Sequence, residues 1–118
     1  KSVSNVHKKP VKEIKTVKTT TLNKILNDLK FNKPIDYLNI DVEGHEFDVL
    51  KGFNLVKYKP NVISIEYLDL KMKYLEFKNN DLNRIINSDF YKLLLNNNYH
   101  FVNWLHGDLI FVHDDFRD

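Results

Sequence analysis

Residues 35–53 read IDYLNIDVEGHEFDVLKGF, and residues 59–67 read KPNVISIEY. In both places a proline precedes a run rich in strand-forming residues, and the run ends on a carboxylate, a pattern typical of a buried strand in a parallel sheet. The charges of Glu46 and Lys51 predict a helix of about two to three turns between the strands, and Gly52 is placed for a left-handed cap. Strand, helix and strand within about 33 residues predict a right-handed parallel crossover.

The sequence before this unit predicts one more strand and a short helix. Residues 11–18 alternate apolar and charged side chains, as in a half-exposed edge strand. Thr20 or Thr21 can then cap a helix whose leucines stand at helical spacing. With the strands of the central unit at residues 35–42 and 61–67, three strands are expected in the first half of the chain.

The sequence after the unit predicts a long helix and a hairpin, and no element is assigned to residues 68–80. Asp81 can cap a helix with one apolar face that continues to residue 96. Two apolar runs, residues 99–105 and 109–113, flank a turn that contains Gly and Asp. The elements together predict an α/β fold with an open, mostly parallel sheet, helices on its faces, and an antiparallel hairpin at its end.

The composition limits the chemistry that the chain can perform. The 118 residues include no cysteine and three glycines, which excludes disulfides, thiolate zinc sites and a cysteine nucleophile. No glycine pair or lysine has the spacing of a phosphate-binding loop. The length fits one small domain. Because there is no apolar run of about 18 residues and no leader pattern, we expect a cytoplasmic protein without a membrane span.

Charge is distributed unevenly along the chain, although the net charge is only +2. Residues 1–33 carry nine lysines and two acidic residues, a charge of +7, and residues 34–118 carry nine basic and fourteen acidic residues, a charge of −5. The N-terminal lysines alternate with apolar residues, and no platform of basic and aromatic side chains accompanies them. We therefore expect no nucleic-acid partner, and we expect residues 1–10 to be poorly ordered.

Four ionisable side chains follow the two central strands. Asp41 ends one strand, Glu66 ends the next, and Glu43 and His45 lie in the loop after Asp41. Neighbouring strands are about 4.8 Å apart, so these groups should meet at the carboxyl edge of the sheet, where ligands bind. Clustered carboxylates raise one another's pKa and can provide a general base, which we assign to Asp41, while His45 can exchange protons near neutral pH. Carboxylates also suit a divalent cation, but we assign no metal ligand.

Each of these residues also has a purely structural interpretation. Asp41 can be a solvated acid at a strand end, Glu43 an acid that complements the helix dipole, and His45 an ordinary surface side chain. Glu66 fits such an interpretation less well. A charge at the edge of a buried strand costs free energy unless another group compensates it.

The two motifs resemble the FkbM family of S-adenosylmethionine-dependent methyltransferases. The shared positions are D-V-E-G after the first strand, E and V-L-x-G in the helix, and the proline and glutamate that bound the second strand: Asp41, Val42, Glu43, Gly44, Glu46, Val49, Leu50, Gly52, Pro60 and Glu66. The sequence TTLNKIL at residues 20–26 is similar to the family's short helix before the first of these strands. The resemblance covers residues 15–67, and the remainder of the chain fits in topology only.

The resemblance implies a class I methyltransferase (Rossmann-like) fold and methyl transfer from S-adenosylmethionine to a hydroxyl group of a small-molecule acceptor, such as a saccharide. It also implies that Asp41 and Glu43 face the transferred methyl group or the acceptor, that Glu66 lies beside them, and that Asp41 contacts the cofactor. The family's glycine-rich turn and the acidic residue after its second strand have no counterpart in this sequence. We therefore expect the C-terminal half of a methyltransferase domain, which by itself binds S-adenosylmethionine weakly.

Two other functions remain open. A non-catalytic methyltransferase-like remnant would serve as an association module, pairing with a missing N-terminal half or with itself through the exposed sheet edge. A metal-dependent hydrolase would use Asp41, Glu43, His45 and Glu66 as ligands. The acceptor and the methylated atom are not readable, because acceptor pockets in this fold are formed by variable loops.

Overall fold

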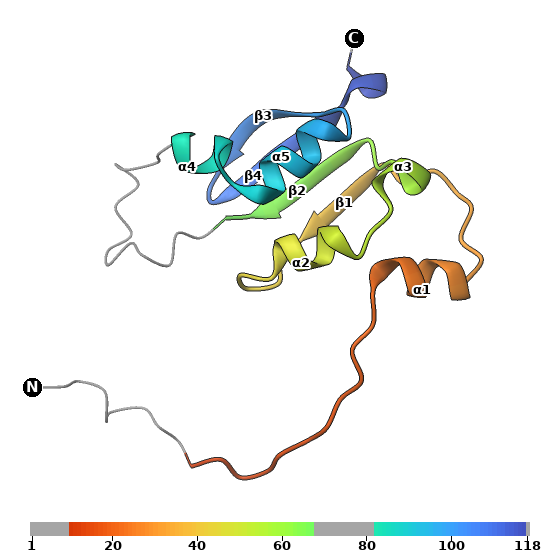
Figure 1. The fold of residues 1–118 in the computed structure, drawn as a ribbon, viewed down its shortest axis with the longest axis vertical. Coiled ribbons are helices and arrows are strands. Elements are labelled where there is room, and N and C mark those ends of the chain that lie inside the picture. The colour runs from red at the N-terminus through yellow and green to blue at the C-terminus, as the bar shows by residue number, and fades with distance from the viewer. Residues whose placement is uncertain (1–9, 68–81, 118) are drawn as a thin grey trace, which may run out of the picture.

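A computed structural model of the chain describes residues 10–67 and 82–117. Residues 68–80, to which no element was assigned, and most of the segment expected to be poorly ordered lie outside these ranges. Four strands form one sheet in the order β1-β2-β4-β3 (Figure 1). Their bounds are Tyr37–Ile40 for β1, Val62–Glu66 for β2, Tyr99–Leu105 for β3 and Asp108–His113 for β4. The central strands and the hairpin therefore form where the sequence predicts them.

The sheet is mixed, as the predicted hairpin requires, and three of the four described strands, β1, β2 and β3, run in the same direction. Strands β1 and β2 are parallel, but β4 is antiparallel to both β2 and β3. The physical reason lies in the connections. Strands that run in the same direction need a long connection, which both the β1–β2 and the β2–β3 connections provide, whereas the tight hairpin after β3 makes β4 run in the opposite direction.

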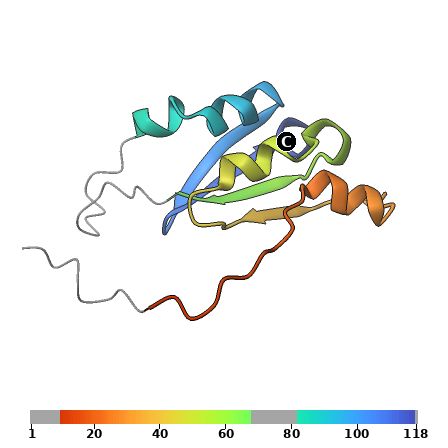
Figure 2. The same cartoon turned by 60° about the horizontal axis from the view of Figure 1, so that its bottom comes forward.

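Residues 11–18 form no strand, contrary to the prediction. The segment leads away from the sheet (Figures 1 and 2), and Val11, Ile14 and Val17 are 77–89% exposed. An alternating pattern forms a strand only where a neighbouring strand takes up its backbone hydrogen bonds. None of the described strands pairs with this segment.

Helix α1, Leu22–Asp28, begins where the sequence predicts it. The hydroxyl of Thr21 accepts a hydrogen bond of 3.1 Å from the backbone N–H of Lys24, which confirms a threonine cap. The helix is tied to the segment after α2, since the backbone N–H of Asn23 donates to the carbonyl of Gly52.

Helix α2, Glu46–Lys51, follows β1 and is shorter than predicted. Its C-cap Gly52 has φ −88°, so the predicted left-handed cap is wrong. A left-handed residue follows later in this connection, since Lys59 has φ 39° at the end of the unpredicted helix α3, Leu55–Tyr58. The side chain of Asn54 caps the start of α3 by accepting a hydrogen bond from the backbone N–H of Lys57.

The long helix predicted over residues 81–96 is interrupted within the described part. Helix α4, Leu82–Ile86, and helix α5, Asp89–Asn96, are separate. Ser88 causes the break, because its Oγ donates to the carbonyl of Ile85 and accepts from the backbone N–H of Tyr91, and so caps the second helix. In the parts of the chain that are described, no helix has the length and apolar composition that crossing a bilayer requires.

Apolar side chains from the sheet and the helices form one core. Helices α2 and α5 pack next to each other over the same face of the sheet (Figure 2). The phenol of Tyr99 is buried in this core and donates to the carbonyl of Pro60 at 2.6 Å. The core fixes β1 against β2, and thereby fixes the carboxyl ends of both strands. Its buried members are Ile40, Leu50, Phe53, Leu55, Tyr58, Ile63, Ile65, Ile85, Phe90, Leu94, Tyr99, Leu109 and Phe111.

Candidate functional site

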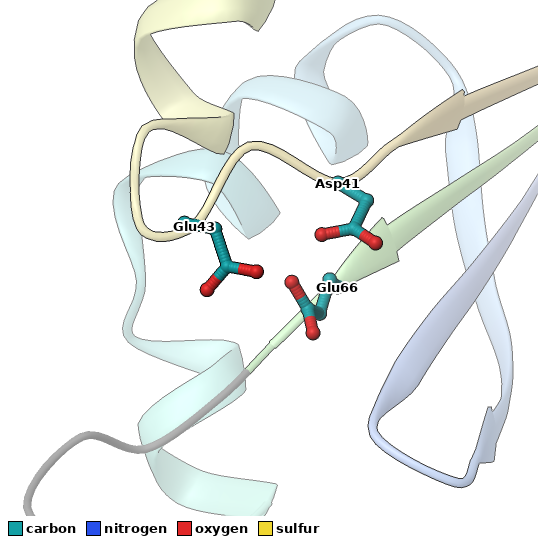
Figure 3. A group of neighbouring side chains, drawn as sticks. All are labelled: Asp41, Glu43 and Glu66. Atoms are coloured by element: carbon teal, nitrogen blue, oxygen red, sulfur yellow. The ribbon is translucent and has the colours of Figure 1, made fainter.

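Three carboxylates converge at the carboxyl ends of β1 and β2. The register pairs Ile40 with Ile65, so Asp41, directly after β1, lies beside Glu66, the last residue of β2. Figure 3 shows that Glu43, from the loop after Asp41, turns its side chain toward the other two. One oxygen from each residue lies within 4.8 Å of the others. The structure thus brings together three of the four residues predicted for the site.

Glu66 carries the most perturbed carboxyl group of this acidic cluster, which we define as Asp41, Glu43 and Glu66. Hydrogen bonding to Asp41, then burial, then the negative charges of Asp41, Glu43 and Glu46 raise the pKa of Glu66 to about 7. Its Oε2 is buried and has no hydrogen-bond partner among the described residues. Near neutral pH the carboxyl group of Glu66 can therefore both hold and release a proton.

His45 does not join the acidic cluster, contrary to the expectation that four groups meet. It occupies the N-cap position of α2, and its Nδ1 lies 3.3 Å from Oδ2 of Asp48 on the exposed side of that helix. Asp48 also pairs with Lys51 at 2.9 Å, and its hydrogen bonds with Lys51 and His45 lower the pKa of the Asp48 carboxyl. The direction of a side chain next to a turn depends on backbone angles that the residue types do not specify, so the sequence could not exclude His45 from the cluster.

The loop that carries Glu43 has an unusual backbone. Glu43 has φ 53° and Gly44 has φ 95°, so two consecutive residues lie in the left-handed region. The carboxylate of Glu46 accepts hydrogen bonds from the backbone N–H groups of Val42 and Gly44, both at 3.2 Å. From the sequence, Glu46 is expected only to be an acid of the first helical turn. The D-V-E-G-x-E spacing is a signal that a side chain reaches back to this loop.

The turn of the β3–β4 hairpin flanks the acidic cluster. Glu66 pairs with Asp108 in the register of β2 and β4, and the backbone N–H of Tyr67 donates to the carbonyl of Gly107 at 2.7 Å. The sequence predicted this turn but not its position beside Glu66, because strand order in a sheet is a long-range property.

The acidic cluster can perform two kinds of chemistry. A carboxyl group whose pKa is near 7 can accept a proton from a substrate hydroxyl at neutral pH. Three converging carboxylate oxygens can also bind a hard divalent cation.

A comparison with protein-family models matches residues 1–101 to the methyltransferase FkbM domain. This match includes β1, α2 and β2, and extends well beyond the residues that carry the sequence resemblance. No curated protein and no solved structure matches the chain significantly. The family match spans most of the 118 residues and contains the whole acidic cluster. The chain belongs to the FkbM methyltransferase family.

Proposed function

We propose that this chain contributes the acceptor side of an S-adenosylmethionine-dependent methyltransferase that methylates a hydroxyl oxygen of a small molecule such as a saccharide. Family membership supports methyl transfer. The Asp41–Glu66 pair is the observation that favours an oxygen acceptor. Removal of a hydroxyl proton needs a base that is active near neutral pH, and the pKa of Glu66 is about 7.

The residues of the acidic cluster suit both partners of such a reaction. S-adenosylmethionine supplies an electrophilic methyl group on a cationic sulfonium, and negative carboxylates are compatible with that charge. Asp41 is the residue that we assign to contact the cofactor. Asp41 and Glu66 accept the proton of the acceptor hydroxyl, and Glu43, from the loop after β1, orients the acceptor. The sequence-based assignment of Asp41 as the sole base is thereby extended to the pair.

We further propose that the adenosine part of the cofactor is held by polypeptide that pairs with the free edge of β1, as in a class I (Rossmann-like) sheet. Two observations support this. Strand β1 lies at one end of the described sheet, and the 118 residues contain no glycine pair with the spacing of a nucleotide-binding turn. The chain alone should therefore bind S-adenosylmethionine weakly, and micromolar affinity by calorimetry would contradict this arrangement.

Replacing Asp41 by Asn tests the assignment in the enzyme that contains the complete methyltransferase domain. The amide cannot accept the proton, so we expect turnover to fall at least about tenfold while cofactor affinity stays nearly unchanged. Transfer of labelled methyl groups to a panel of saccharides and other hydroxyl compounds gives the rates. Asp48→Asn is the matched control, because Asp48 is an exposed acid of α2 outside the acidic cluster. Equal turnover in Asp41→Asn and the wild type would remove Asp41 from the mechanism.

A metal-dependent hydrolase is the second candidate function, favoured by the convergence of the three carboxylates within 4.8 Å. The two functions respond differently to chelation. Methyl transfer by a carboxylate base persists in EDTA, whereas a metal-dependent activity is lost and returns on addition of Mg²⁺ or Mn²⁺. An association module, the remaining alternative, would show neither activity in the complete domain.

A further inference from the structure

Glu46 is a buried acid on a helix whose other acids are exposed. It is the first residue of α2, and only 9% of its surface is accessible, whereas the side chain of Asp48 in the same turn is 63% exposed. An acid that merely complements the helix dipole has no reason to leave solvent. A buried carboxylate costs free energy unless hydrogen bonds compensate it.

The hydrogen bonds of Glu46 lead to the loop of the candidate site. Its Oε1 accepts from the backbone N–H of Val42 and from that of Gly44. These two donors bracket Glu43, whose own φ of 53° is unfavourable for a residue with a side chain. A charged acceptor shared by both N–H groups stabilises the turn in this conformation. Without it, the backbone of Glu43 would relax toward the ordinary regions and its side chain would leave the acidic cluster.

We propose that Glu46 is a positioning residue that holds the Glu43–Gly44 turn and so keeps the Glu43 carboxylate aimed at Asp41 and Glu66. Its catalytic consequence rests on the proposed function, in which Glu43 orients the acceptor. The turn itself does not depend on that function. The pKa of Glu66 adds support, since the charge of Glu46 is among the causes that raise it.

Three substitutions separate the hydrogen bonds of Glu46 from its charge. Glu46→Gln keeps a carbonyl oxygen at the same position and removes the charge. Glu46→Ala removes both. Glu46→Asp keeps the charge but shortens the side chain, so that the carboxylate no longer reaches the loop. This variant replaces Glu46→Ala in the experiment if the alanine variant does not fold. Asp48→Ala is the control, because it removes an exposed acid from the same helical turn.

Amide hydrogen exchange, measured by NMR on the 118-residue chain, reports directly on the hydrogen bonds that hold the turn. We expect exchange at Val42 and Gly44 to accelerate about tenfold or more in Glu46→Ala and Glu46→Asp, and to stay near the wild-type rate in Glu46→Gln and Asp48→Ala. NMR titration of Glu66 gives a second readout. Its pKa should fall in Glu46→Gln, which a purely structural role of Glu46 would not produce. Unchanged exchange at Val42 and Gly44 in both Glu46→Ala and Glu46→Asp would overturn the proposal.

Kinetics in the complete domain then test the catalytic consequence. Glu46→Asp should raise the acceptor KM about tenfold or more, with a smaller effect on the cofactor, and Glu46→Gln should largely restore it. If the wild-type enzyme transfers no methyl group but the exchange pattern is as expected, the proposed function fails and the positioning role stands. If Glu46→Asp loosens the turn without changing KM, Glu43 does not orient the acceptor and the catalytic part of the inference is wrong.

Discussion

Asp41 and Glu66 illustrate how a sheet brings together two acids that lie far apart in the sequence. Asp41 directly follows β1, Glu66 ends β2, and the parallel register of the two strands places these residues side by side. The hydrogen bond to Asp41, together with burial, raises the pKa of Glu66 to about 7. A substitution at Glu66 therefore changes both the protonation of the site and the stability of the fold.

Glu66→Gln should make the folded chain less sensitive to pH. The pKa of Glu66 is raised from 4.5 to about 7, so between these values the folded state binds more protons than the unfolded state. The free energy of unfolding therefore falls as pH rises through this window, and the contribution is fully present only below about pH 4.5. Glutamine removes this dependence, and we expect the variant to be more stable than the wild type at pH 8. Urea denaturation at pH 4.5 and pH 8 measures both effects.

Glu13→Gln is the control for this experiment, because Glu13 is an exposed acid in the segment that leads away from the sheet. It should leave the slope of stability against pH unchanged. Asp48 and Asp115 have lowered pKa values, so their contributions are lost only at more acidic pH, below about 3.8. A wild-type stability that rises between pH 4.5 and pH 7 would contradict the assignment of the proton to the Asp41–Glu66 pair.

The elements around the site show what local sequence can and cannot predict. The strand ends at Asp41 and Glu66 were predictable, because an apolar run after a proline marks each strand within a few residues. The break at Ser88 was not, because an apolar face continues across it and only the hydrogen bonds of the serine reveal a cap. The role of Glu46 was missed for a similar reason, since its bonds depend on a left-handed turn that the residue types do not specify.

Ser88→Ala should destabilise the chain by about 1 kcal/mol, because helix α5 loses its N-cap and carries two core residues, Phe90 and Leu94. Asn87→Ala, in the same break, removes only an exposed side-chain bond to the carbonyl of Asn83 and should change stability by less than about 0.5 kcal/mol. Thermal or urea unfolding followed by circular dichroism measures both. Equal effects of the two substitutions would show that the cap of Ser88 is unimportant.

At the scale of the whole molecule, the described sheet leaves β1 at one end and β3 at the other. Near the free edge of β1, the side chain of Tyr37 is 57% exposed, and the segment before α1 exposes Val11, Ile14 and Val17. The strands that lie at the ends of the sheet could not be predicted, because strand order depends on contacts between residues far apart in the sequence. Residues 11–18 have the alternating apolar and charged side chains of an edge strand, but a strand also needs a neighbouring strand to pair with, which this pattern cannot reveal.

We expect the chain to self-associate through these surfaces, because exposed strand edges and apolar side chains pair with further copies. A double variant, Ile14→Lys and Val17→Lys, should shift the sedimentation coefficient toward that of a monomer. Val56→Lys is the matched control, since Val56 is equally exposed but lies on helix α3. Concentration-independent monomeric sedimentation of the wild type would rule out this form of association.

The two-residue turn between β3 and β4 also bears on the order in which the sheet assembles. His106 and Gly107 both have positive φ, as tight hairpin turns require, and a hairpin closes within about 10 μs. Pairing β1 with β2 must close a longer loop and costs more entropy. We expect the hairpin to form early, and amides of β1 to exchange with solvent faster than those of β4 in native-state NMR experiments. The carboxylates of Asp41 and Glu66 would then meet only at the last stage of folding. A ligand that binds between them would therefore bind only fully folded chains.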